Sequence, residues 1–233
     1  MDGPQQGMPV DAAGPTGAQQ QQHRTVSGPA CAATTLILLA LVGGVLGTVS
    51  DWRNYLVVHD FRAGAATVAD LEAADTFSRS VSIPALVVYV AAGVLFLVWL
   101  WRARINAELS GGPAAQRRSR AWVVAGWFTP VANLWFPYQV VSDIWRAGAP
   151  RQVALRGLVT AWWVLYVADT MISRTLSGFY LKETITEEGL RSTANLATLG
   201  TVLDVAAGGL IVLIINRITT WQNQKQTLAQ NAA

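Results

Sequence analysis

Four apolar stretches, each of about 20 residues, constrain the fold of this chain more than any other feature of its sequence. They cover residues 30–50, 81–101, 157–176 and 195–216. A helix of about 20 apolar residues matches the hydrocarbon thickness of a bilayer, and its backbone satisfies its own hydrogen bonds in lipid. The alternating pattern of a membrane barrel does not occur in the sequence. The stretches therefore predict an all-α, polytopic membrane protein with four transmembrane helices.

The composition supports the same class. Charged residues are 13% of the chain and hydrophobic residues are 52%, whereas a typical soluble domain has roughly 25% charged residues. A single cysteine, Cys31, excludes a disulfide framework, and two histidines, His23 and His59, are too few for a zinc cluster. A net charge of +3 is too small for a nucleic-acid-binding face. We therefore expect the lipid bilayer, and no nucleic acid, to be a partner.

The ends of the chain differ from its apolar middle. Residues 1–30 are rich in Gly, Pro, Gln and Ala, and they cannot bury enough apolar surface to offset the entropy cost of folding. This composition predicts a disordered cytoplasmic tail. We expect a helical membrane domain over residues 31–217 and a short polar cytoplasmic tail over residues 218–233.

A fifth apolar stretch, residues 121–145, contains two prolines and either crosses the membrane or enters and returns. If it crosses, nine of the 17 Lys and Arg residues lie inside and eight outside; if it does not, eleven lie inside and six outside. The positive-inside rule favours the second arrangement. We therefore predict four spans with both termini cytoplasmic, plus a proline-broken re-entrant or interfacial element at the inner face. Five spans is the alternative.

Two acidic residues, Asp169 and Asp204, fall inside predicted spans, where a carboxylate costs about 2.5 kcal/mol or more. Counted along the two helices, both lie roughly 18 Å from the inner boundary, so antiparallel neighbours would bring them to one level. Tyr166 and Ser173 share the helix face of Asp169 and are candidate hydrogen-bond donors to it. This candidate intramembrane polar site is either a proton or cation relay or a structural pair of acids that holds the helices in register.

The first apolar stretch carries a GxxxG pattern, formed by Gly43 and Gly47. Small residues at this spacing let two helix backbones approach closely. The pattern predicts either a homodimer face or close packing within the same bundle.

Basic and aromatic residues gather after the second span. Trp99 and Trp101 end the span, and five arginines follow: Arg102, Arg104, Arg117, Arg118 and Arg120. Such a cationic, aromatic-rich segment suits anionic lipid headgroups at the inner face. The alternative is that these residues only set the topology and anchor the protein at the interface.

Two segments, residues 99–108 and 120–147, resemble an actinobacterial membrane family catalogued as domain of unknown function 4328. The second segment contains the pattern GWFxPxxNLWxP, and the resemblance extends over about residues 80–217. The matching positions are Trp101, Arg104, Asn106, Trp122, Gly126, Trp127, Phe128, Pro130, Asn133, Leu134, Pro137, Asp143 and Trp145. The resemblance implies a multi-spanning bacterial membrane protein with no assigned activity.

The same segment has a physical interpretation of its own. Pro130 and Pro137 interrupt backbone hydrogen bonding, and an irregular backbone at membrane depth persists only inside protein or beside a water-filled cavity. Asn133 lies between the prolines and can satisfy the freed backbone groups. The candidate broken-helix element, which includes Trp127, is therefore either structurally capped or a ligand or ion site of the kind that transporters build.

No motif for catalysis or cofactor binding occurs in the sequence, so we expect no enzymatic activity and no cofactor. The leading hypothesis is a non-enzymatic accessory, scaffold or sensor component of the bacterial plasma membrane, with a membrane protein as its partner. The alternative is a small-molecule or proton-linked transporter that uses Asp169 and Asp204.

Overall fold

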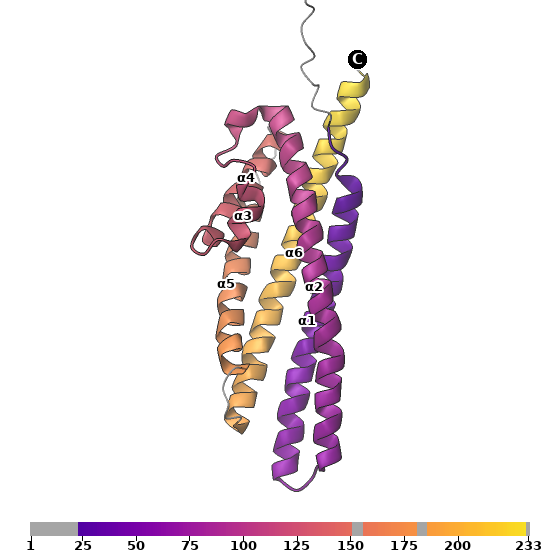
Figure 1. The fold of residues 1–233 in the computed structure, drawn as a ribbon, viewed down its shortest axis with the longest axis vertical. Helices are drawn as coiled ribbons and strands as arrows, with labels where there is room; N and C mark the ends of the chain where they lie inside the picture. Colours follow the sequence, from indigo (N-terminus) through magenta and orange to yellow (C-terminus); the bar gives the residue numbers. More distant parts are fainter. Residues whose placement is uncertain (1–22, 151–155, 181–185, 232–233) are drawn as a thin grey trace, which may run out of the picture.

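The computed structural model describes residues 23–150, 156–180 and 186–231, and every regular element in these ranges is helical (Figure 1). The α-helices are α1 (Ser27–Arg62), α2 (Val68–Gly111), α3 (Trp122–Phe128), α4 (Phe136–Gly148), α5 (Arg156–Tyr180) and α6 (Glu187–Asn231). Two short 3₁₀ turns, η1 (Pro113–Ala115) and η2 (Ala132–Leu134), flank α3. The predicted all-α class is therefore confirmed for the described ranges.

Three helices, α1, α2 and α6, are long and apolar enough to cross a membrane. The helix α5 has 25 residues and is not one of these three. Length and composition therefore make this a membrane protein with three candidate spans, where the sequence pattern predicts four.

The long helices pack in the order α2, α1, α6, α5 (Figure 1). The helices α2 and α5 are barely in contact, and the α3–α4 hairpin, residues 122–148, lies between them. This hairpin lies toward the end of the bundle where Ser27 and Asn231 are found, which we call the termini end. At the opposite end, the turn end, residues 63–67 join α1 to α2.

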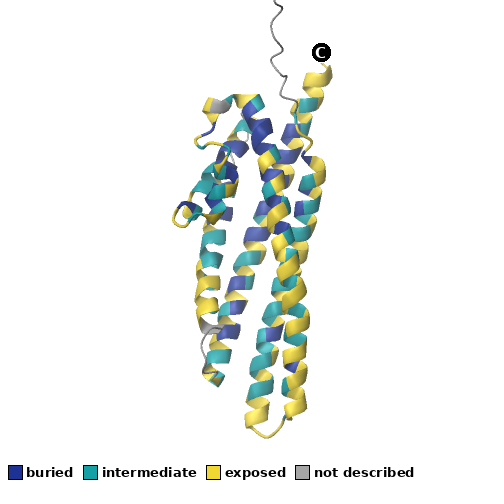
Figure 2. Cartoon of the chain, viewed as in Figure 1, coloured by how far each residue is buried: buried dark blue, intermediate teal, exposed yellow. Residues whose placement is uncertain are grey.

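The largest buried side chains gather at the termini end, around the hairpin (Figure 2). They include Trp99, Leu100, Val140, Val141, Ile144, Ile214, Ile215 and Ile218. By contrast, large apolar side chains of α1 and α2 such as Val42, Ile83 and Leu86 are exposed. Water would make such exposure costly, whereas lipid would not, so this distribution suits a bilayer around the bundle.

Both predicted tails are shorter than expected where the structure describes them. Residues 1–22 and 232–233 lie outside the described residues. The helix α1 begins at Ser27, not after residue 30, because Val26 and Ala30 are buried in the core. The helix α6 continues to Asn231, and Ile218 and Trp221 pack into the bundle. These residues were predicted to be polar tails because they contain no continuous apolar stretch. Their few apolar residues are instead spaced so that they lie on one face of a helix.

The GxxxG pattern of α1 packs partly within the bundle. A Cβ on Gly43 would lie 3.0 Å from the Cβ of Ala85 on α2, so this glycine permits a close approach of the two helices. Gly47 has no such neighbour within 4 Å. Packing within the bundle therefore accounts for Gly43, and a homodimer through Gly47 stays a prediction.

Candidate functional site

The two predicted intramembrane acids lie on neighbouring helices, Asp169 on α5 and Asp204 on α6, and interact electrostatically. A Cβ on Gly200 of α6 would lie 3.6 Å from Oδ1 of Asp169. Similarly, a Cβ on Gly44 of α1 would lie 3.6 Å from Oδ2 of Asp204. Each carboxylate therefore packs against a glycine of the adjacent helix.

Neither carboxylate has a hydrogen bond or an ion pair within the part of the chain that the structure describes, and both are half-buried. The predicted hydrogen bonds from Tyr166 and Ser173 to Asp169 are not formed. The carbonyl of Tyr166 instead accepts from Thr170, and the side chain of Ser173 is exposed. The i, i+4 spacing places Ser173 one turn from Asp169 on the same helix, but this spacing alone does not make a hydrogen bond between the two side chains.

A third residue at this site, Tyr89 on α2, was missed by the sequence reasoning. Its phenol lies within electrostatic range of both Asp204 and Asp169, and the side chain is largely exposed. No motif spacing could reveal it, because α2 is far from α5 and α6 in the sequence. Tyr89, Asp169 and Asp204 together form what we call the carboxylate site, on the side of the bundle where α2 and α5 do not pack together.

The broken-helix element is a pair of short helices joined by a strained turn. The amide of Ala132 donates to the carbonyl of Pro130 at 2.6 Å across Val131, whose backbone has φ 65° and ψ −54°. This is a γ-turn with positive φ, a strained conformation that is rare for a β-branched residue. Pro137 occupies the first turn of α4, where a missing N–H costs little. The prolines therefore separate α3 from α4 instead of kinking a continuous helix.

Asn133 does not cap the freed backbone groups as predicted. Its Oδ1 atom is buried without a hydrogen-bond partner, as is Nε1 of Trp127. The indole of Trp127 instead meets aromatic rings of α2 and α5, with centroid distances of 5.5 Å to Phe96, 6.3 Å to Trp163 and 5.8 Å to Tyr166. The element is therefore held by aromatic packing, and its outer tip exposes apolar side chains, Phe128 at 73% and Val131 at 68%.

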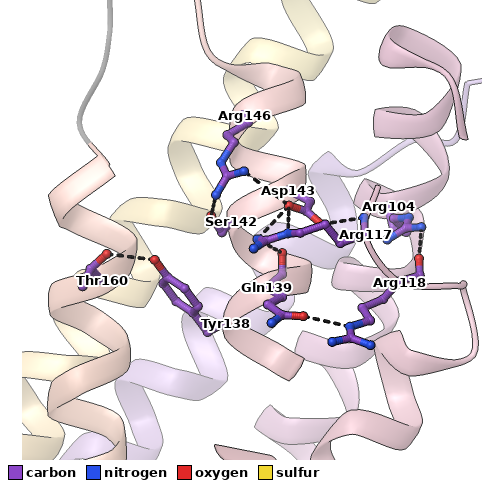
Figure 3. Close-up of polar contacts among 9 residues, drawn as sticks. All are labelled: Arg104, Arg117, Arg118, Tyr138, Gln139, Ser142, Asp143, Arg146 and Thr160. Atoms are coloured by element: carbon purple, nitrogen blue, oxygen red, sulfur yellow. Dashed lines mark hydrogen bonds and ion pairs between the residues drawn. The ribbon is translucent and has the colours of Figure 1, made fainter. Parts of the chain in front are cut away.

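The five arginines predicted to contact lipid headgroups have partners within the protein, and Figure 3 shows three of them, Arg104, Arg117 and Arg118. Arg104 is only 2% exposed, and its Nε donates to Oε1 of Glu108 at 2.9 Å. Its Nη2 donates to the carbonyl of Arg118. The prediction of a headgroup contact is therefore wrong for Arg104, because the α2–α3 connection covers it. An acid four residues later on the same helix was the signal that could have identified its partner.

Glu108 also forms an ion pair with Arg120, in which Nη2 of Arg120 lies 2.6 Å from Oε2 of Glu108. Burial disfavours the charged form of Glu108, but its contacts with Arg120 and Arg104 outweigh that effect and lower the pKa of the carboxyl. Glu108 lies beyond the apolar part of α2. It therefore stays ionised and joins α2 to the segment that leads into α3.

A second buried acid, Asp143 on α4, also binds the segment between α2 and α3. Its carboxylate accepts from the backbone N–H of Arg117 at 2.9 Å and from Nε of Arg117 at 2.8 Å (Figure 3). Arg118 donates to Gln139 at 2.8 Å and lies 3.8 Å above the ring of Phe136. Arg102 donates to the carbonyl of Thr25 at 3.1 Å. Arg117 and Arg120 remain 42% and 41% exposed, so lipid contact stays a prediction for these two.

At the turn end, α1 and α6 are joined by ionisable groups. Nδ1 of His59 lies 2.6 Å from Oε1 of Glu187, and Arg62 lies 3.4 Å from its Oε2. A pocket of about 540 Å³ beside this contact is lined by Tyr55, Arg62, Thr186, Glu187, Glu188 and Arg191. Within the described ranges no group of three or more His, Cys, Asp or Glu side chains gathers to hold a metal ion.

The contact of His59 with Glu187 predicts that raising the pH destabilises the turn end. The hydrogen bond to Glu187 and the charge of Glu187 raise the pKa of His59 above 6.5. Stabilisation by the protonated form is therefore fully present below pH 6.5 and lost as the pH rises through the raised pKa. Nuclear magnetic resonance of the ¹³C-labelled His59 ring should give a pKa above 6.5. Glu187→Gln should return it toward 6.5, whereas Glu188→Gln should not; an unchanged pKa in Glu187→Gln would contradict the assignment.

A family model described as a domain of unknown function (DUF4328) matches residues 62–220. This match confirms the family resemblance seen in residues 99–147, and it extends the matched region through the whole of α2. Comparisons with curated proteins and with solved structures give no match.

Proposed function

The chain belongs to the DUF4328 family, a domain of unknown function, and we propose its role from its own structure. We propose a four-span protein of the plasma membrane with both termini in the cytoplasm. It serves as a non-enzymatic accessory subunit and binds a transmembrane helix of a partner protein at Asp169 and Asp204. The observation that carries the proposal is that these two carboxylates have no hydrogen bond and no basic partner within the described chain.

The topology rests on α5 as the fourth span. At 25 residues and 1.5 Å per residue, α5 is about 37 Å long, and it packs along α6, which is itself a candidate span. The charges at the two ends support this orientation. Toward the termini end the described residues include ten basic ones: Arg24, Arg102, Arg104, Arg117, Arg118, Arg120, Arg146, Arg156, Arg217 and Lys225. Toward the turn end they include five: Arg53, Arg62, Arg79, Arg174 and Arg191. The positive-inside rule then puts the termini end in the cytoplasm.

In this orientation the α3–α4 hairpin enters the inner leaflet and returns. The exposed apolar tip, with Phe128 and Val131, faces acyl chains. The partly exposed guanidinium groups of Arg117 and Arg120 belong to the segment between η1 and α3, which we place at the level of the headgroups. Anionic lipids at the inner face are therefore part of the proposal.

The other buried acids of the chain support the proposal of a partner helix at Asp169 and Asp204. The buried acids Glu108 and Asp143 each hold arginine side chains. Asp169 and Asp204 hold none, and both are half-buried on helices that are not closely packed against α2 or, for α5, against α1. A carboxylate in the bilayer costs about 2.5 kcal/mol or more, and a Lys or Arg on an incoming helix would offset that cost. The site therefore favours a partner helix with a basic residue at the same depth.

One observation favours a second function, a proton-linked transporter. Asp169 and Asp204 lie close enough to interact, and two such carboxylates can share a proton. A transporter would need that proton to exchange with water on both sides of the membrane.

The test uses the full-length chain in its native membrane, with a photo-crosslinking amino acid in place of the exposed Tyr89. We expect a crosslink to one partner protein, and we expect Asp169→Asn/Asp204→Asn to abolish it. The exposed acid Asp75 supplies the matched control, and Asp75→Asn should leave the crosslink intact. A crosslink that survives the double substitution, or no crosslink at all, would contradict the proposal. Proton flux through the purified chain that requires Asp204 would favour the transporter instead.

A further inference from the structure

Four residues before α1, residues 23–26, are not helical, and the end of α2 holds them through a side-chain amide. The backbone N–H of Arg24 donates to Oδ1 of Asn106 at 2.8 Å, and Nδ2 of Asn106 donates to the carbonyl of Arg24 at 2.8 Å. A side chain that pairs with both backbone groups of one residue replaces the hydrogen bonds that a neighbouring strand would make. Asn106 therefore recognises the backbone of Arg24 irrespective of the side chain at that position.

The amide of Asn106 is oriented in advance by α6. Its Nδ2 also donates to Oε1 of Gln222 at 3.2 Å, and Nε2 of Gln222 donates to the carbonyl of Ala103 at 2.9 Å. Asn106 is 2% exposed and Gln222 is 4% exposed. Every polar atom of the two side-chain amides has a hydrogen-bond partner, so Asn106 and Gln222 form one fully satisfied buried network.

Two further contacts extend recognition along the segment. Arg102 donates to the carbonyl of Thr25 at 3.1 Å, and the side chain of Val26 is 1% exposed within the hydrophobic core. The side chains of Arg24 and Thr25 are exposed. The contacts therefore select two backbone positions and one small apolar side chain, and they leave the identity of the first two residues unrestricted.

We infer that Asn106, Gln222 and Arg102 form a peptide-binding site for a short segment whose first residue is held by its backbone N–H and C=O and whose third residue, at the start of a helix, has a small apolar side chain. The chain's own residues 24–26 occupy this site in cis, and a peptide with the same pattern can replace them. Occupation by residues 24–26 ties the N-terminal tail to the ends of α2 and α6, and exchange releases it. This inference rests on the termini end and is independent of the carboxylate site.

The test measures release of the segment in the full-length chain in nanodiscs. A nitroxide is attached through Arg24→Cys in a Cys31→Ser background, which leaves one labelled position because Cys31 is the only natural cysteine. The label should be immobilised. A synthetic peptide of residues 23–27 at millimolar concentration should mobilise it, whereas the same peptide with Val26→Asp should not.

Asn106→Ala should raise the ratio of mobile to immobile label about tenfold or more without any peptide, because two hydrogen bonds to Arg24 are lost. Thr220→Ala is the matched control, since Thr220 on α6 bonds only within its own helix, and it should leave the spectrum unchanged. Circular dichroism identifies any variant that fails to fold. If Asn106→Ala fails to fold, Asn106→Asp is used in its place, since Asp cannot donate to the carbonyl of Arg24. A label that stays immobilised in the folded Asn106 variant, or that no peptide mobilises, would overturn the inference.

Discussion

Replacing Glu108 with alanine should lower the free energy of unfolding by about 3–5 kcal/mol, the cost of removing one partner of a buried ion pair. The substitution leaves the guanidinium of Arg104, which is 2% exposed, without its carboxylate. It also removes the contact that holds Arg120 against α2. Reversible unfolding of the full-length chain in mixed micelles, titrated with sodium dodecyl sulfate, measures the loss.

The control for Glu108 is an exposed pair on the same helix. Asp75 and Arg79 lie 2.6 Å apart, four residues from one another, with side chains 59% and 74% exposed. Asp75→Ala should therefore cost no more than about 1 kcal/mol. If Glu108→Ala and Asp75→Ala destabilised the chain equally, the pair of Arg104 and Glu108 would not be the buried interaction described here.

Trp99→Ala should also lower the free energy of unfolding by about 3–5 kcal/mol, because it removes a fully buried aromatic side chain. The indole packs against Phe96, with ring centroids 5.7 Å apart, and its Nε1 donates to Oγ1 of Thr219 at 3.1 Å. The same detergent titration measures the effect. Trp101, two residues along the helix, is 37% exposed and provides the control. Trp101→Ala should cost clearly less, and the reverse order would contradict the orientation of α2.

The helical class and the interruption at residues 121–145 were predictable because both follow from local rules. Apolar stretches of about 20 residues predict membrane helices, and Pro130 and Pro137 predict a break. The orientation of individual side chains was not predictable in this way. Ser173 has the right spacing for Asp169 and yet is exposed. The strained turn at Val131 also leaves no sequence signal, because β-branched residues rarely adopt positive φ.

The charged residues at the termini end show most clearly what could not be predicted from the sequence. The five arginines between residues 102 and 120 were predicted to face lipid, because sequence alone does not show which acidic residues lie beside them in the fold. The structure brings Glu108 and Asp143 to these arginines from different elements. In contrast, Asp169 and Asp204 were identified from depth alone, since an acid inside a long apolar stretch is unusual whatever surrounds it. Their neighbour Tyr89 required the fold.

In the proposed four-span topology, the α3–α4 hairpin returns to the cytoplasmic side, and α5 crosses the membrane with Asp169 inside the bilayer. Single cysteines at Ala149, Ala229 and Gly64, in a Cys31→Ser background, test it by labelling with an impermeant maleimide in intact cells and in opened cells. Gly64→Cys should be labelled in intact cells, whereas Ala149→Cys and Ala229→Cys should be labelled only after the cells are opened. Labelling of Ala149→Cys and Ala229→Cys from outside intact cells would contradict this topology.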